Sequence, residues 1–262
     1  MTSSLVHKSV IVCGSTQGIG LASATALAEA GASILMVARD PERLEAARAG
    51  LPRPAGQEHR SLTADFSDPE AAAAKLRGWL AEHGPAHVLV NNGGGPPGGP
   101  ITEATPEAFL AAFRSHLLAC HLLSQAVLPG MKEAGYGRII NIVSTSVRQP
   151  IKGLGVSNTT RGAVASWAKT LAGEVGPFGI TVNNVLPGAT RTGRLDAVIR
   201  AKATATGRPT TDVEAEMLAE IPMGRFADPS EVAAAVVFLA SPAAGYITGV
   251  SLPVDGGRIS SL

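Results

Sequence analysis

The sequence predicts a single α/β domain with a doubly wound parallel sheet of about seven strands and helices on both faces. Short β-branched runs of strand length alternate along the chain with Ala-rich segments of helical length. No internal repeat of about 20 to 50 residues is visible, which argues against a solenoid. A chain of 262 residues is long enough for one well-buried core and needs no second domain, so we assign residues 1–262 to a single domain.

Five of the expected strands are strong and two are weaker. The strong runs cover residues 9–13, 33–38, 87–91, 138–143 and 180–185. The weaker runs, 61–64 and 251–254, bring the sheet to about seven strands. Residues 190–221 interrupt the alternation with a polar, helix-prone sequence after a strand end, which is a common place for a ligand-covering flap. We expect this segment to be a substrate lid.

Composition excludes several classes of partner. The chain is 45% hydrophobic and 16% charged with a formal net charge of +1, so it lacks the basic excess that drives nucleic-acid binding. Residues 1–8 lack the pattern of a signal peptide, and no apolar run reaches the roughly 20 residues of a membrane span. Cys13 and Cys120 lie in apolar stretches, which predicts buried free thiols in a reducing compartment. We therefore expect a cytoplasmic protein without nucleic-acid or membrane partners.

A glycine-rich turn follows the first expected strand and leads into an Ala-rich helix. Its residues are Gly14, Ser15, Thr16, Gln17, Gly18, Ile19 and Gly20. Such a turn brings backbone N–H groups and a helix N-terminus against a pyrophosphate, as in Rossmann-like dinucleotide sites. Glycines between a strand and a helix also occur for packing reasons alone, and the position at the first strand–helix junction favours the dinucleotide interpretation.

The end of the second expected strand carries the signal for cofactor choice. An acidic residue there binds the ribose hydroxyls of NAD(H), whereas an arginine can hold the 2′-phosphate of NADP(H). This chain has Ala38 followed by Arg39, so we expect NADP(H) in preference to NAD(H). Two alternatives stay open: Arg39 is a solvated surface charge, and Asp40 either contacts ribose or caps the helix that starts at Pro41.

Further motifs extend this pattern over almost the whole chain. They are Asn91-Asn92-Gly93-Gly94, Gly137-Arg138-Ile139-Ile140-Asn141-Ile142-Val143-Ser144, Val182-Asn183-Asn184-Val185-Leu186-Pro187-Gly188, and Thr248-Gly249 with Val254-Asp255-Gly256-Gly257. Taken in order, with the glycine turn, they resemble the short-chain dehydrogenases/reductases, single-domain proteins of about 250 residues. The resemblance implies an NAD(P)(H)-dependent oxidoreductase that transfers hydride to or from a small carbonyl or alcohol substrate.

The resemblance also implies site residues and assembly. Ser144 is the expected catalytic serine, and Asp65 stands where the family contacts adenine. Beyond the glycine turn and Arg39, the expected cofactor-binding residues are Asp65, Phe66, Asn91, Gly93, Arg161, Pro187, Gly188, Thr190 and Thr192. Relatives commonly form dimers or tetramers through long helices, here about 106–128 and 156–175, so we expect a homo-oligomer. No metal site is expected.

The catalytic positions depart from the family pattern. The family has a Tyr 13 residues after the catalytic Ser and a Lys four residues later, where this chain has Ser157 and Arg161. A fourth position, usually Asn, falls on His116. Ser157 is too weak an acid to replace the Tyr but can donate a hydrogen bond to an oxyanion beside Ser144. Arg161 keeps the positive charge as an electrostatic clamp or ribose anchor.

His116 has two interpretations. It can titrate near neutrality and supply the missing proton, directly or through water. It can also pack within its helix, hydrogen-bonded to the backbone. Within the lid, Arg191, Arg194 and Arg200 meet either an acidic substrate or solvent.

Three functions therefore remain possible. The first is a carbonyl reductase or alcohol dehydrogenase in which Ser144, Ser157 and Arg161 bind the oxyanion and His116 or water supplies protons. The second is a reductase of an activated alkene, whose enolate the same groups stabilise. The third is a catalytically silent NADP(H)-binding protein, serving as a partner subunit or sensor. Because the replacements can still organise an anion, the sequence favours an active oxidoreductase.

Overall fold

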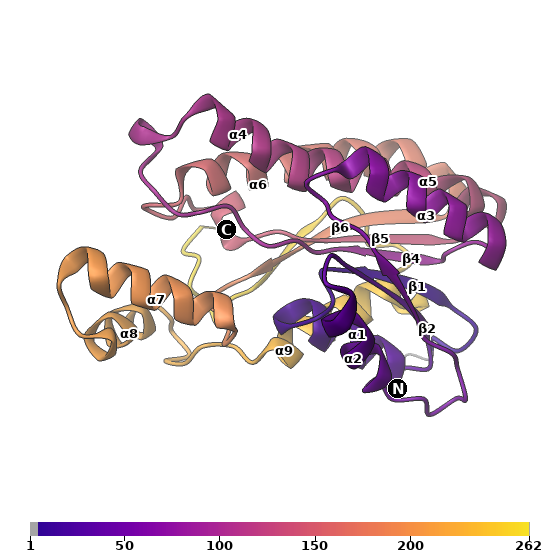
Figure 1. Cartoon of the computed structure of the whole chain (residues 1–262), viewed down its shortest axis with the longest axis horizontal. Helices are drawn as coiled ribbons and strands as arrows, with labels where there is room; N and C mark the ends of the chain where they lie inside the picture. The colour runs from indigo at the N-terminus through magenta and orange to yellow at the C-terminus, as the bar shows by residue number, and fades with distance from the viewer. Residues whose placement is uncertain (1–4, 262) are drawn as a thin grey trace.

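Seven parallel strands form one sheet in the order β3-β2-β1-β4-β5-β6-β7 in this computed structural model (Figure 1). The structure describes residues 5–261, so Leu262 and the first four residues of the N-terminal segment 1–8 lie outside the described part of the predicted domain. The strands are β1 (Ser9–Cys13), β2 (Ser33–Ala38), β3 (Arg60–Thr63), β4 (Val88–Asn91), β5 (Gly137–Ile142), β6 (Ile180–Pro187) and β7 (Ser251–Val254). The predicted sheet is confirmed.

Helices cover both faces of the sheet, as predicted (Figure 1). One face carries α1 (Gly18–Glu29), α2 (Pro41–Ala49) and α9 (Pro229–Ala240), and the other carries α3 (Pro69–His83), α5 (Ala119–Glu133) and α6 (Gly155–Val175). Alternate strand residues supply the two cores: Val10 and Val12 pack in the first layer, while Ile11 packs in the second. Both faces are therefore apolar, which is why these strands read as continuous hydrophobic runs.

Strands β1 to β3 are added toward one edge of the sheet and β4 to β7 toward the other, so the strand order reverses between the neighbouring strands β1 and β4. The connection from β1 runs through α1 on one face, and β5 leads to α6 on the other. A crevice forms outside the carboxyl ends of parallel strands at such a switch point, and ligands bind there. The fold thus places the glycine-rich turn and the strand carrying Ser144 at the same edge of the sheet.

The predicted lid forms two helices, α7 (Gly193–Thr206) and α8 (Thr210–Ala219), which project from the end of the sheet (Figure 1). Leu195, Ile199 and Val213 belong to a small apolar cluster of its own. Lid function itself stays a prediction. Between residues 5 and 261, no helix has the length and apolar character that crossing a membrane requires.

A π-helical turn interrupts the long helix that follows the Gly/Pro loop of residues 93–100. The expected helix 106–128 is divided into α4 (Pro106–Ala112), the π-helical turn Phe113–Leu118 and α5. Such turns widen a helix by one residue and are frequent at functional sites. Here the turn carries His116, which is buried with 6% of its surface exposed.

Candidate active site

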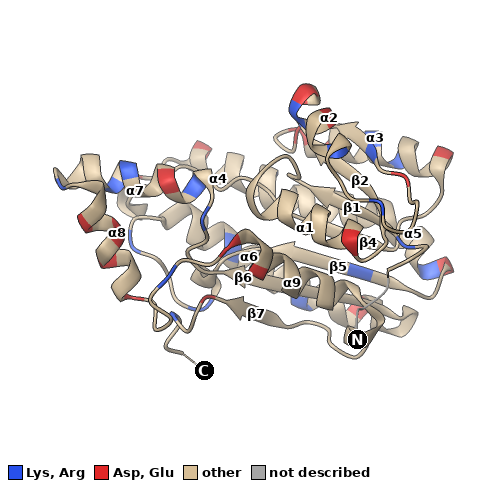
Figure 2. Ribbon diagram, turned by 90° about the horizontal axis from the view of Figure 1, so that it is seen from below, with Lys and Arg blue, Asp and Glu red and all other residues tan. Residues whose placement is uncertain are grey.

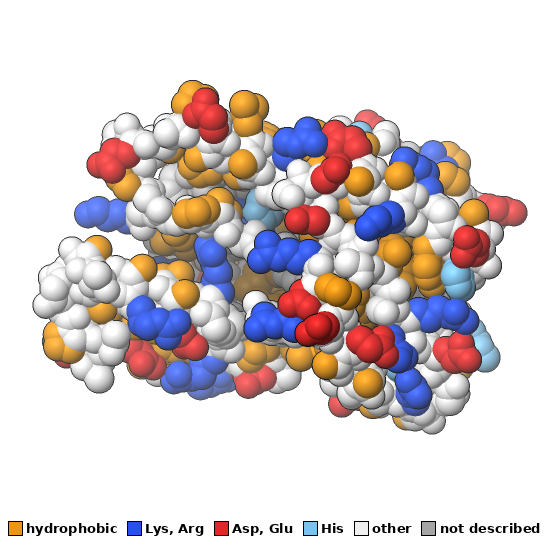
Figure 3. Space-filling view, in the orientation of Figure 1, with side chains coloured by type: hydrophobic (Ala, Val, Ile, Leu, Met, Phe, Trp, Pro, Cys, Tyr) orange, Lys and Arg blue, Asp and Glu red, His pale blue; other side chains and the backbone are white. Residues whose placement is uncertain are grey.

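A cleft of about 1130 Å³ runs along the carboxyl ends of the strands, between the glycine-rich turn and the start of α7. In the space-filling view this face is hollowed near its centre, and Lys and Arg side chains lie on several sides of the opening (Figure 3). Among the predicted site residues, the cleft is lined by Gly14, Thr16, Gln17, Gly18, Ile19, Arg39, Asp65, Phe66, Gly93, Ser144, Ser157, Arg161, Pro187, Gly188, Thr190 and Thr192. Ser15, Gly20, Asn91 and His116 do not line it.

Close packing explains the glycines at Gly14 and Gly20. Gly14 has φ +58°, and a Cβ added to Gly20 would lie 2.1 Å from the Gly14 carbonyl oxygen. The turn can therefore fold tightly enough to present the first turn of α1 to the cleft. This helix has no side-chain cap and no acidic residue in its first turn, so its N–H groups are available to an anion. The cradle fits the pyrophosphate of a dinucleotide.

Asn92 supports the turn from the neighbouring strand, and sequence reasoning did not assign it to the site. Its Nδ2 donates to the carbonyl oxygens of Cys13 at 3.3 Å and Gly14 at 3.1 Å. The side chain thereby ties the end of β4 to the end of β1. A polar residue directly after a strand end, beside the predicted Asn91, was the available signal.

The end of β2 resolves the choice for Asp40. Its Oδ1 accepts a hydrogen bond from Arg43 N at 3.0 Å, so Asp40 caps α2 and does not line the cleft. Arg39 is exposed and lines the cleft. Asp65 also lines the cleft. Its Oδ1 accepts a hydrogen bond from Ser67 N at 2.9 Å, and this hydrogen bond lowers the pKa of Asp65. At the end of β2, Arg39 is therefore the charged side chain that lines the cleft.

Ser144, Ser157 and Arg161 share the opposite part of the cleft. Ser144 follows β5, and its Oγ accepts from Ser146 N at 3.1 Å, which fixes the side chain at the strand end. Ser157 lies in the first turn of α6, and Arg161 lies one turn further on. Arg161 Nη1 donates to the Ile142 carbonyl oxygen at 2.9 Å, so the guanidinium is held against the end of β5. Two hydroxyls and a cation thus converge on one end of the cleft.

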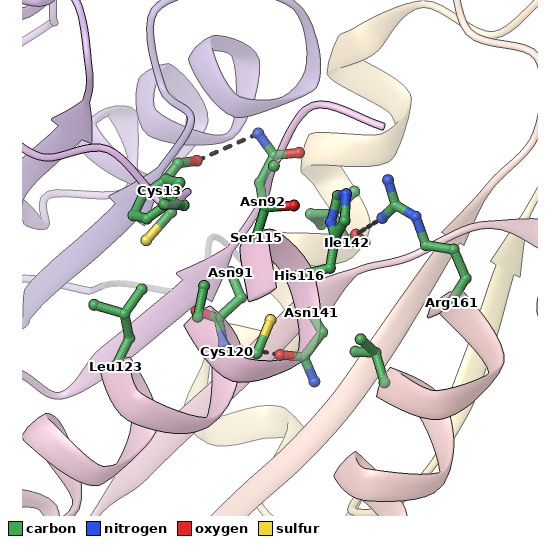
Figure 4. A pocket seen from close by; sticks show the side chains of 14 residues that line it. Cys13, Asn91, Asn92, Ser115, His116, Cys120, Leu123, Asn141, Ile142 and Arg161 are labelled. Atoms are coloured by element: carbon green, nitrogen blue, oxygen red, sulfur yellow. Dashed lines mark hydrogen bonds between the residues drawn. The ribbon is translucent and has the colours of Figure 1, made fainter. Parts of the chain in front are cut away.

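A smaller cavity of about 30 Å³ lies behind Arg161, large enough for one or two water molecules. Figure 4 shows His116 and Arg161 reaching it from the π-helical turn and from α6. Asn91 and both cysteines also line it, and the cysteines are free. Cys13 is buried as predicted, whereas Cys120 is half-buried, and burial raises the pKa of its thiol to about 12.

A row of hydrogen-bonded side chains crosses four strands beside this cavity. Asn91 Nδ2 donates to Asn141 Oδ1 at 2.9 Å, Asn141 Nδ2 donates to Asn184 Oδ1 at 3.0 Å, and Asn184 Nδ2 donates to Ser251 Oγ at 3.2 Å. These residues are in register on β4 to β7. Such a buried row fixes the relative position of the strand ends that carry the site. The sequence motifs contained these asparagines, but only the register aligns them.

The expectation that His116 titrates near neutrality is wrong in this setting. Burial, together with the positive charges of Arg161 and Arg194, lowers the pKa of His116 to about 3. The ring is therefore neutral at physiological pH and is no cationic acid. The alternative of a backbone hydrogen bond also fails in part, because His116 Nε2 is buried without a hydrogen-bond partner among residues 5–261. This atom and the equally unpartnered Asn91 Oδ1 belong to residues of the small cavity.

This burial predicts an acid-sensitive fold. A histidine with a pKa of about 3 when folded and 6.5 when unfolded favours unfolding as the pH falls below 6.5, because the unfolded chain binds more protons. We expect His116 to lower the free energy of unfolding by about 2 kcal/mol between pH 7.5 and 5. Urea titrations at both values should show this loss reduced in His116→Asn. If the unmodified protein and His116→Asn lose the same free energy of unfolding between pH 7.5 and 5, the low pKa of His116 is contradicted. Above pH 7 the difference in free energy of unfolding between the two proteins should not change with pH.

The family model described as enoyl-(acyl carrier protein) reductase matches residues 14–258. The 3-oxoacyl-(acyl-carrier-protein) reductase of Vibrio cholerae is 34% identical over 253 residues, covering 97% of this chain and 98% of that protein. The chain belongs to the short-chain dehydrogenase/reductase family. The D-beta-hydroxybutyrate dehydrogenase of Cupriavidus necator is 32% identical over 257 residues, covering 97% and 98% of the two chains.

Solved structures of this family match the fold over 97 to 100% of the chain. L-sorbose reductase from Gluconobacter frateurii, solved with NADPH and L-sorbose, has a TM-score of 0.93 at 32% identity and covers all of both chains. YwfH, an NADPH-dependent reductase of bacilysin biosynthesis, has a TM-score of 0.91 at 28% identity over 97% of this chain and 99% of that one. This short-chain dehydrogenase/reductase is therefore an oxidoreductase that binds NAD(P).

Proposed function

We propose that this protein is an NADP(H)-preferring reductase of a small carbonyl compound, with an altered catalytic site that binds the oxyanion in place of the family's Tyr and Lys. The observation that carries the proposal is the convergence of Ser144, Ser157 and Arg161 on one end of the cofactor cleft. Neither tyrosine offers an alternative: Tyr136 donates its hydroxyl to the Ala240 carbonyl oxygen, and Tyr246 is fully exposed near the C-terminus and does not line the cleft.

These residues act by stabilising charge. NADPH, when bound, supplies the hydride for the carbonyl carbon. Negative charge then develops on the carbonyl oxygen, and hydroxyl donors held in place stabilise it without reorganisation. Arg161 stays protonated at neutral pH, because burial and Arg194 lower its pKa only to about 10. Its positive charge favours the alkoxide, in the role of an electrostatic clamp.

The proton for the alkoxide comes from water in the open cleft. Serine hydroxyls are very weak acids, and His116 is neutral and lines the small cavity behind Arg161, not the open cleft. His116 therefore contributes as a neutral group behind Arg161, not as the acid. Proton delivery by water makes turnover slower than in a site with a tyrosine, because positioned acids contribute about 10² to 10⁴ in rate.

Arg39 supports the preference for NADP(H), since it lines the cleft where the ribose of a dinucleotide would lie, while Asp40 is engaged as a helix cap. Replacing Arg39 with Gln should raise the KM for NADPH about tenfold and leave the KM for NADH unchanged, because a charge-assisted hydrogen bond to the 2′-phosphate is lost. Arg43→Gln is the matched control, since Arg43 is exposed beside Asp40 and does not line the cleft. Equal changes for both cofactors would contradict the role of Arg39.

A second candidate function is reduction of an activated alkene. The family model that matches the chain is described as an enoyl reductase, and enolate stabilisation needs no tyrosine. The two candidates are separated by offering ketones, aldehydes and activated alkenes with NADPH or NADH and following the absorbance of the cofactor. A Ser157→Tyr/Arg161→Lys variant runs in parallel. Oxidation of NADPH or NADH by the unmodified protein in the presence of ketones or aldehydes supports the proposal. Oxidation of the cofactor with activated alkenes alone supports the second candidate.

If the unmodified protein oxidises no cofactor with any of these substrates and the Ser157→Tyr/Arg161→Lys variant does, both candidates are contradicted. That result would indicate a catalytically silent NADP(H)-binding protein.

Two further expectations accompany the proposal. The 190–221 segment acts as the substrate lid, supported by Leu195 and Val198 of α7 in the cleft lining. The protein assembles as a dimer or tetramer in the cytoplasm, with Leu110 of α4 65% exposed on one of the expected assembly helices.

A further inference from the structure

Two arginines reach the end of the cleft that holds the reactive serines. We call the part lined by Ser144, Leu154, Ser157, Arg161, Arg194, Leu195 and Val198 the substrate end. Arg161 comes from α6, which covers one face of the sheet, and Arg194 from the first turn of α7 in the lid segment. Their side chains bring two positive charges to a region otherwise lined by hydroxyl and apolar groups.

Three of the four other cations of the lid segment are paired with carboxylates, and Arg200 is the exception. Figure 2 shows acidic residues along α8 beside the basic residues of α7. Arg191 pairs with Glu214 at 3.3 Å, and Lys202 and Arg208 both pair with Glu216. In contrast, the described residues 5–261 contain no carboxylate within ion-pair distance of Arg161 or Arg194. Among the described residues, neither charge is therefore paired with a carboxylate.

The cleft lining contains three acidic residues, and none of them belongs to the substrate end. Glu29 is exposed at the end of α1, and Asp65 accepts from Ser67 N in the turn after β3. Asp228 caps α9 by accepting from Ser230 N at 2.8 Å. The substrate end therefore carries positive charge without a paired carboxylate. Burial is the main cause of the lowered pKa values of Arg161 and His116, and the charge of Arg194 lowers both further.

Both guanidinium groups are held in place by backbone oxygens. Arg194 donates from Nη1 to the Gly95 carbonyl at 3.0 Å and from Nη2 to the Pro96 carbonyl at 2.9 Å. A Cβ on Gly95 would lie 2.8 Å from Arg194 Nη2, so the glycine permits this close approach. Arg161 uses one donor on the Ile142 carbonyl. An arginine has five N–H donors, so Arg161 keeps four and Arg194 three for a ligand, and carboxylates are preferred partners of a guanidinium group.

We infer that the substrate carries a carboxylate, held by Arg161 and Arg194, and is therefore an oxo acid. The inference rests on the proposed carbonyl reduction. The carbonyl carbon gains a hydride from NADPH, which becomes NADP⁺, the oxygen gains a proton from water, and the carboxylate is unchanged. Burying a carboxylate beside two fixed cations compensates its loss of hydration, whereas a neutral ketone would leave Arg194 without an anion and Arg161 with the developing alkoxide alone.

Matched acids and esters test the inference by turnover. We would compare 2-oxobutanoate and 4-oxopentanoate with their methyl esters, using NADPH. The acids should have the higher kcat/KM, and Arg194→Gln should lower it at least about tenfold for the acids while changing it less than about twofold for the esters. Arg200→Gln is the control, since it makes the same charge change on the same helix outside the cleft lining. Equal kcat/KM values for each acid and its ester would overturn the inference without contradicting the proposed carbonyl reduction.

A binding measurement separates the inference from the proposed function. Oxamate, a non-reducible relative of an oxo acid, should bind the NADP⁺-loaded protein in calorimetry, whereas neutral methyl oxamate should bind at least about tenfold more weakly. Oxamate binding without turnover of any carbonyl would refute the proposed reduction but support the anion site. Absence of oxamate binding would overturn the inference. The affinity for NADPH, measured by fluorescence, should be unchanged in Arg194→Gln. If the affinity for NADPH fell by the same factor as kcat/KM for the acids, Arg194 would be assigned to the cofactor site instead.

Discussion

Replacing Gly20 with alanine should weaken NADPH binding by at least about 100-fold while the domain stays folded. The added Cβ would lie 2.1 Å from the Gly14 carbonyl oxygen and 2.6 Å from Asn92 Nδ2. The first of these is a backbone atom, so relief requires the whole turn to move away from the N-terminus of α1. The pyrophosphate cradle would then lose its shape. Fluorescence titration with NADPH measures the effect.

Gly173→Ala is the matched control for this variant. Gly173 is exposed on α6, and no atom outside its own helix lies within 4 Å of an added Cβ. We expect about 0.5 to 1 kcal/mol of added stability, because alanine has the higher helix propensity, and unchanged NADPH binding. Thermal unfolding by circular dichroism shows whether each variant is folded. Tight binding by a folded Gly20→Ala protein would refute the role of the turn.

Local patterns were sufficient to predict the fold. Each of the seven strands is a short run bounded by turn residues, and the structure shifts their ends by no more than two residues. Burial on both faces makes such runs continuous, so β1 and β2 are clear from the sequence alone. The edge strand β3 was weaker because its residues are only partly buried or exposed, which removes the apolar pattern.

The site was predicted where its chemistry depends on residues near a strand end. The glycine turn and Ser144 follow β1 and β5 directly, so parallel topology places them at one edge. The role of Arg194 was left open because its partners, the carbonyls of Gly95 and Pro96, lie almost 100 positions earlier in the chain. For His116 the sequence left titration and packing within the helix both open. Its low pKa depends on burial and on Arg161 and Arg194, which come from other helices, so the sequence alone could not choose between the two interpretations.

Ser144→Ala should lower kcat for the carbonyl substrate by about 10² to 10³, because one donor to the developing oxyanion is lost. The substitution also removes the hydrogen bond that Ser146 N donates to Ser144 Oγ, so a structural effect must be separated from a chemical one. Ser144→Thr keeps a hydroxyl for both roles and should retain more activity than Ser144→Ala. NADPH affinity and Tm should change little in either variant. A lower Tm with unchanged kcat would contradict the catalytic assignment.

A double-mutant cycle with Ser157→Ala tests whether the two hydroxyls serve the same oxygen. If both donate to one oxyanion, removal of either leaves a misplaced substrate, and the second removal costs less than it does in the unmodified protein. If the fold-losses in kcat of the two single variants multiply in the double variant, the two hydroxyls act on independent parts of the substrate. Because Ser157 lies in the first turn of α6 and Ser144 at the end of β5, additivity would also mean that the helix and the strand act separately. We expect coupling, since both line the substrate end together with Arg161.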